Sequence, residues 1–203
     1  MFADTASDTR RNDYYRRINE VFVDKAVAGM RMIPIPELTT AVEVLHTLRT
    51  KGNRVYVFGN GGSASTASHM VCDLAKTAQR PFEPPLRAFS LVDGNAVLTA
   101  YANDVSYVDA FARQLTTNAE PGDVVIAISA SGRSPNVLTA LRTAREMGLY
   151  SIGLLGCGGG TAASLVDLAL VIESTDFGVI ETAHMGIVHA FAAALGAPEP
   201  EVL

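Results

Sequence analysis

Four side chains that could transfer protons or bind a metal lie on two segments with helical periodicity. His69 and Asp73 are four residues apart, one turn apart on the same face of a helix. Glu181 and His189 lie on the last predicted helix, with His184 between them. At about 100° per residue, His184 lies ~60° to one side of Glu181 and His189 ~80° to the other. Either histidine could therefore share a site with Glu181. A site that contains both histidines is harder to form, because they lie on opposite sides of Glu181.

One histidine and one carboxylate from each of two helices would suit two kinds of chemistry. The set could bind zinc or another divalent metal, and it equally suits a pair of groups for acid–base catalysis. Neither spacing is a signature by itself. From spacing alone, ordinary polar residues on half-exposed helices remain an alternative.

A glycine-rich turn precedes the helix that carries His69. Residues 54–58 are rich in β-branched and aromatic side chains and predict a strand that ends at Gly59. The turn continues to residue 63, and a helix follows with Ser63 or Ser65 as its expected N-cap. Backbone N–H groups and the positive end of the helix make such a corner attractive to a phosphate.

A second corner of the same kind follows the apolar strand predicted over residues 124–128. Three serines come next within six residues, and Pro135 then opens a helix for which Ser134 is the expected N-cap. One cap does not need three hydroxyls, whereas a phosphate could bind them all together with N–H groups and a helix end. An ordinary serine-rich turn is the alternative.

Strands and helices alternate along the chain, which predicts an α/β fold with a doubly wound, five-stranded parallel sheet. We expect one domain, with residues 1–11 flexible, N-terminal helices over 12–50 and the α/β core over 54–195. Both corners lie at the carboxyl ends of strands, where such sheets bind ligands, so they can meet at one site. The further predicted strands are 87–92, 150–155 and 168–172, and the further helices are 95–101, 107–115, 137–147, 162–166 and 181–195.

Composition excludes several other classes. The net charge of −5 disfavours a dedicated nucleic-acid-binding protein. The two cysteines indicate no disulfide framework, and no apolar run approaches the ~20 residues of a membrane span. The polar N-terminus lacks the apolar core of a signal peptide. We therefore expect a cytoplasmic protein without direct contact to nucleic acid or membrane.

A dinucleotide-binding domain is a competing interpretation of the first corner. Residues 59–64 fit the pattern G-x-G-x-x-[GA] after a strand, and Asp93 could serve as the ribose ligand. The pattern is weak alone, and Asp93 comes late, behind a proline-rich insertion. The second, serine-rich corner has no part in that scheme.

Four motifs in order along the chain resemble the sugar isomerase (SIS) domain family, and within it the phosphoheptose isomerase branch. They are GNGGSASTASHMVCDL, ND at 103–104, ISASGRSPN and ETAHMGIVH. The resemblance covers residues 20–195. It implies a flavodoxin-like fold and a homotetramer with its sites at subunit interfaces. It also implies conversion of sedoheptulose 7-phosphate to the 7-phosphate of D-glycero-D-manno-heptose, by proton transfer between C1 and C2 through an enediol.

The resemblance assigns roles by position. It implies a phosphate site at Ser129, Ala130, Ser131 and Ser134, where alanine replaces the family's threonine. It implies that the sugar is lined by Asn60, Gly61, Gly62, Ser63, Asn103 and Asp104. His69, Asp73, Glu181 and His189 match positions at which some members bind zinc, and the family's base and acid match Asp73 and His189.

Two departures from the family pattern bear on the reaction. Asp73 stands where glutamate is usual, and Glu181 stands where glutamine is usual. Our hypothesis is that Asp73 or Glu181 is the base and that His189 is the acid or holds a metal. Another phosphosugar could be the substrate. A non-catalytic adaptor or sensor, like the member that tethers a replication initiator, is the second hypothesis, although an adaptor would not need these four side chains.

Overall fold

Five parallel strands form the central sheet of the computed structural model, which describes residues 6–198. The strand order is β2-β1-β3-β4-β5, so the direction of winding reverses between β1 and β3. Val57 of β1 pairs with Ile126 of β3 across this point. The predicted fold class is therefore confirmed. The strands are β1 (Arg54–Gly59), β2 (Arg87–Ser90), β3 (Val124–Ser129), β4 (Tyr150–Leu155) and β5 (Leu168–Val171).

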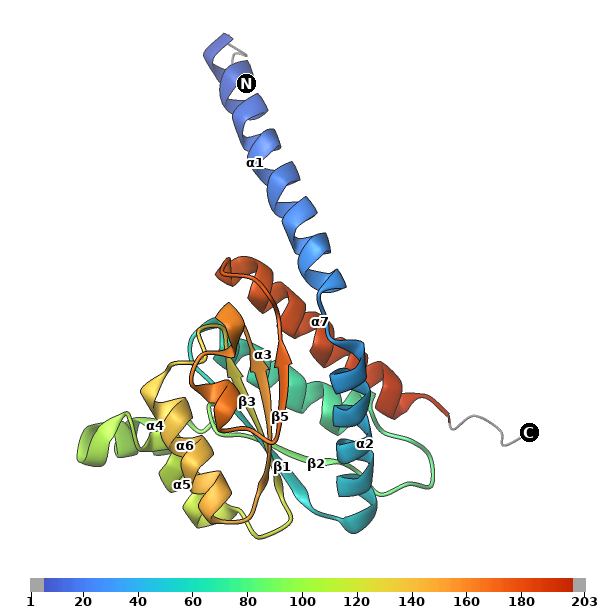
Figure 1. The fold of residues 1–203 in the computed structure, drawn as a ribbon, viewed down its shortest axis with the longest axis vertical. Helices are drawn as coiled ribbons and strands as arrows, with labels where there is room; N and C mark the ends of the chain where they lie inside the picture. The colour runs from blue at the N-terminus through green and yellow to red at the C-terminus, as the bar shows by residue number, and fades with distance from the viewer. Residues whose placement is uncertain (1–5, 199–203) are drawn as a thin grey trace.

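Helices cover both faces of the sheet because alternate strand residues point to opposite sides. Val55 and Val57 face a core shared with α2 (Ile35–Lys51), α3 (Gly62–Cys72) and α7 (Phe177–Gly196). Tyr56 and Phe58 face the other core, which α5 (Ala110–Asn118) and α6 (Pro135–Glu146) cover. In Figure 1, α3 and α7 lie behind and above the strands, and α5 and α6 lie on the opposite side. Shorter elements are α4 (Asn95–Tyr101), the π-helical turns η1 (Asp73–Thr77) and η2 (Ala102–Ser106), and the 3₁₀ turns η3 (Cys157–Gly159) and η4 (Ala162–Ser164).

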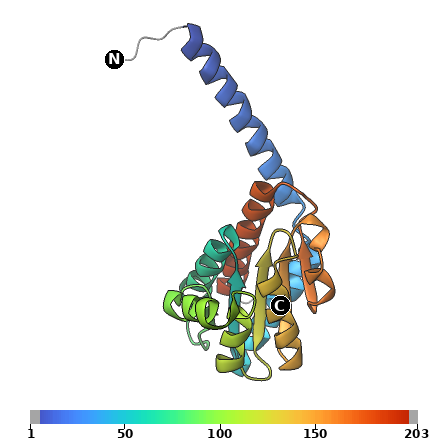
Figure 2. The same ribbon diagram turned by 90° about the vertical axis from the view of Figure 1, so that its left-hand side faces the viewer.

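The first helix, α1 (Ala6–Arg31), stands away from the rest of the molecule in both views (Figures 1 and 2). It begins before the expected start at residue 12, so residues 6–11, expected to be flexible, are helical. The ion pair between Asp8 and Arg11, three residues apart, favours this extension. Only its C-terminal part packs on α7, where Phe22 contacts Gly178. The rest of the prediction of a flexible N-terminus falls on residues 1–5, outside the described residues.

Three local predictions were wrong. The N-cap of α3 is Gly61 rather than Ser63 or Ser65, because Gly61 adopts a positive φ of 58° that closes the turn early. The helix expected over 107–115 is α5, which begins only at Ala110 and ends at Asn118, because α4 continues directly into the π-helical turn η2 before it. Helix α7 begins at Phe177 because Asp176 accepts a capping hydrogen bond from the N–H of Gly178 at 3.1 Å.

Helix α7 is long and apolar enough to cross a membrane by length and composition, and it is the one such helix in residues 6–198. Half of that window is buried inside the protein. Residues such as Ile180, Ile187 and Phe191 are completely buried in the core that α7 shares with the sheet. Packing in the core therefore accounts for its apolar composition.

Candidate active site

The first predicted corner forms a tight loop between β1 and α3. Its left-handed residue, Gly61, and the next residue, Gly62, are exposed at the N-terminus of α3. No side chain caps this helix end. Ser63 is only 5% exposed, and its Cβ packs closely against Gly59. The loop thus leaves backbone N–H groups exposed at an uncapped helix end, as predicted. Ser63 is buried and packs against the backbone of the loop at Gly59.

The second corner leaves part of its hydroxyls available. Ser129 is buried and accepts a hydrogen bond from the N–H of Gly132 at 3.1 Å. Ser131 is half-buried and accepts from the N–H of Arg133 at 3.2 Å. Ser134 is the N-cap of α6 by position, but its side chain makes no capping hydrogen bond. A hydroxyl at a helix N-terminus that does not cap the helix can bind an anion.

The glycine segment after β4 supports this second loop directly. A Cβ on Gly132 would lie 2.0 Å from the carbonyl oxygen of Gly159, so the two backbones touch. The N–H of Ala162 also donates to the carbonyl of Gly132 at 2.9 Å. Glycine is required at 132 both for this contact and for its φ of 60°.

A hydrogen-bonded pair of asparagines joins the two loops. Asn60 of the first loop exchanges two hydrogen bonds with Asn136 of α6, at 2.8 and 2.9 Å. The hydroxyl of Tyr107 donates to Asn60 Oδ1 at 2.7 Å. The corners therefore meet at the point where the strand order reverses. Sequence reasoning missed Asn136 and Tyr107. The position of Asn136, directly after the serine-rich segment SASGRSP, is a weak indication that it belongs to the site, whereas nothing in the sequence around Tyr107 indicates a role.

Three of the four predicted proton-transfer or metal residues form one cluster. Asp73 Oδ2 lies 3.3 Å from His69 Nε2 and 3.3 Å from His189 Nδ1. The two imidazole rings meet edge to face, with centroids 5.0 Å apart. The other carboxylate oxygen of Asp73 accepts from Thr77 Oγ1 at 3.0 Å. The His189 side chain is 59% exposed, and that of Asp73 only 14%, so the cluster opens to the surface between α3 and α7.

Glu181 lies apart from this cluster. Among residues 6–198, the one group of potential metal ligands with all its atoms within 4.8 Å of one another contains His69, Asp73 and His189. Glu181 and His189 are eight positions apart on this helix, a rise of ~12 Å. The Glu181 carboxylate instead touches Gly62, where a Cβ would lie 2.5 Å from both of its oxygens. A carboxylate therefore sits beside the first loop, and Glu181 as a metal ligand stays a prediction.

The polar pair Asn103 and Asp104 lies in η2, and both residues are exposed. Asn103 Nδ2 donates to Asp104 Oδ1 at 2.7 Å. Asp104 lines a hollow between α4 and α5 together with Tyr101 and Gln114. The link from this segment to the first loop comes from Tyr107, so a role of the pair in sugar binding stays a prediction.

His184, the alternative partner of Glu181, points into the core instead. It is completely buried, and neither ring nitrogen has a hydrogen-bond partner. Burial lowers the pKa of His184 to about 4; the backbone of Leu155 acts in the opposite direction but too weakly to offset burial. His184 is therefore neutral at pH 7 and does not belong to the exposed cluster.

Comparison with known proteins decides the family. The SIS domain model matches residues 23–156. The chain is 43% identical over 152 residues to the phosphoheptose isomerase of Pelobacter propionicus, covering 73% of this chain and 78% of that protein. The chain belongs to the SIS domain family, in its phosphoheptose isomerase branch. A phosphoheptose isomerase of Mycobacterium bovis is 37% identical over 182 residues, covering 87% of this chain and 92% of the relative.

Solved phosphoheptose isomerases share the fold. The structure from Neisseria gonorrhoeae superposes with a TM-score of 0.82 at 26% identity, and covers 90% of this chain and 98% of that one. The dinucleotide-binding interpretation is not supported. Asp93, its expected ribose ligand, accepts a hydrogen bond from Ser68 of α3, and the matching family model is the SIS domain.

Proposed function

We propose that this protein is an aldose–ketose isomerase that converts sedoheptulose 7-phosphate to D-glycero-D-manno-heptose 7-phosphate. The observation that carries the proposal is the position of Glu181, whose carboxylate touches Gly62 beside two loops that we predict to bind an anion and that Asn60 and Asn136 join. A phosphate held at the serine loop would leave the sugar beside this carboxylate. The named activity of the relatives supports the same substrate. The protein would work in the cytoplasm, without direct contact to nucleic acid or membrane.

The reaction needs a base and an acid near C1 and C2. A base takes a proton from C1 of the ketose, the enediol forms, and a proton is returned at C2. Glu181 is the better placed base, because no described residue forms a hydrogen bond or an ion pair with its carboxylate. Both oxygens of Asp73, in contrast, already have partners: His69 and His189 on one oxygen and Thr77 on the other. His189 would serve as the acid when no metal is bound, since it lies next to Asp73 and is exposed; in the alternative, it holds a metal that takes over this role.

The cluster of His69, Asp73 and His189 fits a divalent metal. Two imidazole nitrogens and one carboxylate oxygen are a common ligand set of catalytic zinc, and here they converge within 4.8 Å. Zinc bound there would polarise the carbonyl oxygen of a sugar. The chain's own contribution is to hold the three ligands, with Thr77 orienting the Asp73 carboxylate. Glu181 would join this set only if a second copy supplied it.

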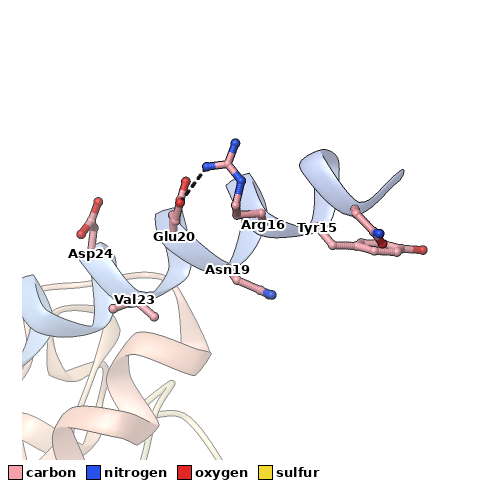
Figure 3. Close-up of a pocket in the computed structure, with 7 residues that line it drawn as sticks. Tyr15, Arg16, Asn19, Glu20, Val23 and Asp24 are labelled. Atoms are coloured by element: carbon pink, nitrogen blue, oxygen red, sulfur yellow. Dashed lines mark hydrogen bonds and ion pairs between the residues drawn. The ribbon is translucent and has the colours of Figure 1, made fainter. Parts of the chain in front are cut away.

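We further propose a homotetramer in which a second copy completes each site. Helix α1 carries a row of large apolar side chains that the rest of residues 6–198 leaves about half exposed, for example Ile18 at 47% and Val21 at 54%. Figure 3 shows part of this helix, with the side chains of Tyr15, Asn19 and Val23 standing out from it and the Arg16–Glu20 ion pair above them. Association of copies would bury these side chains. It could also bring the exposed cluster of one copy to the loops of another, across the ~12 Å that separates Glu181 from His189 in one chain.

The direct test is to incubate the purified protein with sedoheptulose 7-phosphate, with added zinc and with chelator, and to measure the aldose product. Aldose formation supports the isomerase. Tight binding of the phosphosugar without product would point to another phosphosugar substrate, or to an adaptor or sensor. Mixing a Glu181→Gln variant with a His189→Ala variant tests the shared site. Recovery of turnover after subunit exchange is expected if the two side chains come from different copies, and no recovery would refute it.

A further inference from the structure

The side chain of Asn60 is held on two sides by residues from other parts of the chain. Its amide exchanges hydrogen bonds with Asn136, which is 3% exposed, and accepts another from the half-exposed Tyr107. These residues lie 76 and 47 positions away along the sequence. A loop residue anchored by two distant elements has little freedom to rotate, so its amide presents one fixed face.

The direction of these hydrogen bonds follows from one backbone group. The N–H of Val137 donates to Asn136 Oδ1 at 3.0 Å, and a backbone N–H can only donate. Because this fixes the oxygen of Asn136, its amide nitrogen faces Asn60 and donates to Asn60 Oδ1 at 2.9 Å. The amide nitrogen of Asn60 then donates to Asn136 Oδ1 at 2.8 Å. Oxygen and nitrogen of the Asn60 amide are thus assigned without reference to a ligand.

The Asn60 amide keeps one hydrogen-bonding group free for a ligand. Its Oδ1 has two lone pairs, one used by Asn136 and the other by Tyr107. Its Nδ2 has two hydrogens, one used by Asn136, and the second has no acceptor within residues 6–198. Asn60 can therefore offer a ligand one N–H donor and no acceptor.

We infer that Asn136 and Tyr107 are positioning residues that hold Asn60 as a hydrogen-bond donor to the reacting oxygen of the phosphosugar. The inference rests on the proposed isomerase. Asn60 is two residues from Gly62, which the Glu181 carboxylate touches, so the donor belongs to the same end of the site as the proposed base. During isomerisation the oxygens on C1 and C2 gain negative charge as the enediol forms. A fixed N–H stabilises that charge more than it stabilises the neutral carbonyl, and the gain appears in kcat.

The test uses three substitutions, each made alone and in an Asn60→Ala background. Tyr107→Phe removes one donor from a half-exposed side chain and leaves the fold intact. Asn136→Asp keeps the acceptor for the Val137 N–H but loses the donor to Asn60, and Asn136→Ala removes both. We expect each single variant to lower kcat on the order of 10- to 100-fold, since a lost oxyanion donor costs about 10²–10³ and a misaligned one less. KM should change by less than about 3-fold, and in the Asn60→Ala background the three changes should have no further effect.

Asn118→Ala is the matched control. Like Asn136, Asn118 is an asparagine whose Nδ2 donates a hydrogen bond, here to the carbonyl of Gln114 at 2.8 Å, but it lies at the end of α5 and does not contact Asn60. It should leave kcat unchanged. Equal losses with and without Asn60, or unchanged kcat in both Tyr107→Phe and Asn136→Asp, would overturn the inference. Turnover by the unmodified protein checks the proposed function separately. If that turnover is absent, the same non-additive pattern must appear in the calorimetric affinity for a phosphosugar hydroxamate, which mimics the negatively charged enediol, and its absence there overturns the positioning role.

Discussion

Replacing Gly62 with alanine should separate catalysis from stability. A Cβ at this position would lie 2.5 Å from both carboxylate oxygens of Glu181, whereas ordinary contacts begin at 3.4 Å. The carboxylate must therefore retreat by about 1 Å. A displacement of about 1 Å at a reacting group can cost on the order of 10²-fold in rate. We expect kcat for sedoheptulose 7-phosphate to fall by about that factor in a coupled or NMR assay of the aldose.

The same substitution should not destabilise the protein. Gly62 opens α3 and does not have a positive φ, and alanine is favoured over glycine inside helices by up to about 1 kcal/mol. The clashing atoms are the far end of a flexible side chain, which can move. The melting temperature should stay equal or rise. Gly94→Ala is the matched control, because its Cβ would meet nothing closer than Val97 at 4.0 Å, and it should leave kcat unchanged.

Two results would refute this reasoning. Unchanged kcat in Gly62→Ala would mean that the position of Glu181 does not matter for the chemical step. A further loss when Gly62→Ala is added to Glu181→Ala would mean that the new methyl group acts on the substrate itself rather than through Glu181.

Three further predictions follow from the cluster, the exposed helix and the buried histidine. His189→Ala should abolish turnover while calorimetry still detects phosphosugar binding; unchanged turnover would exclude His189 as the acid. Ile18→Asp together with Val21→Asp should dissociate the oligomer, which light scattering coupled to size exclusion can measure; an unchanged mass would show that α1 is not the contact. Because burial lowers the pKa of His184 to about 4 from an ordinary 6.5, the unfolded chain takes up that proton first as the pH falls. The free energy of unfolding should therefore decrease between pH 6.5 and 4, by up to about 3 kcal/mol. Urea titrations should show this slope reduced in His184→Gln, and equal slopes would contradict it.

The sequence predicted the elements well where local signals agree. The apolar runs of β1, β3 and β4 and the proline at the start of α6 fixed those boundaries to within one residue. The early start of α7 was missed because it depends on the cap at Asp176. The start of α3 was missed because a left-handed Gly61, rather than a serine, ends the loop.

The candidate site was predicted only in part, because periodicity describes one helix at a time. The pairing of His69 with Asp73 follows from spacing, and their contact with His189 depends on how α3 packs on α7. That packing also carries Glu181 to Gly62 and away from the cluster. The bonds from Asn60 to Asn136 and Tyr107 join distant segments through the strand order, which local patterns do not encode.

The most direct test of the central claim is an NMR experiment in D₂O with sedoheptulose 7-phosphate as the substrate. Proton transfer through an enediol predicts aldose that carries deuterium at C2, together with deuterium at C1 of the remaining ketose, and neither with the Glu181→Gln variant. Ketose that stays unchanged with and without zinc, with no aldose and no deuterium on carbon, would contradict the proposed isomerase.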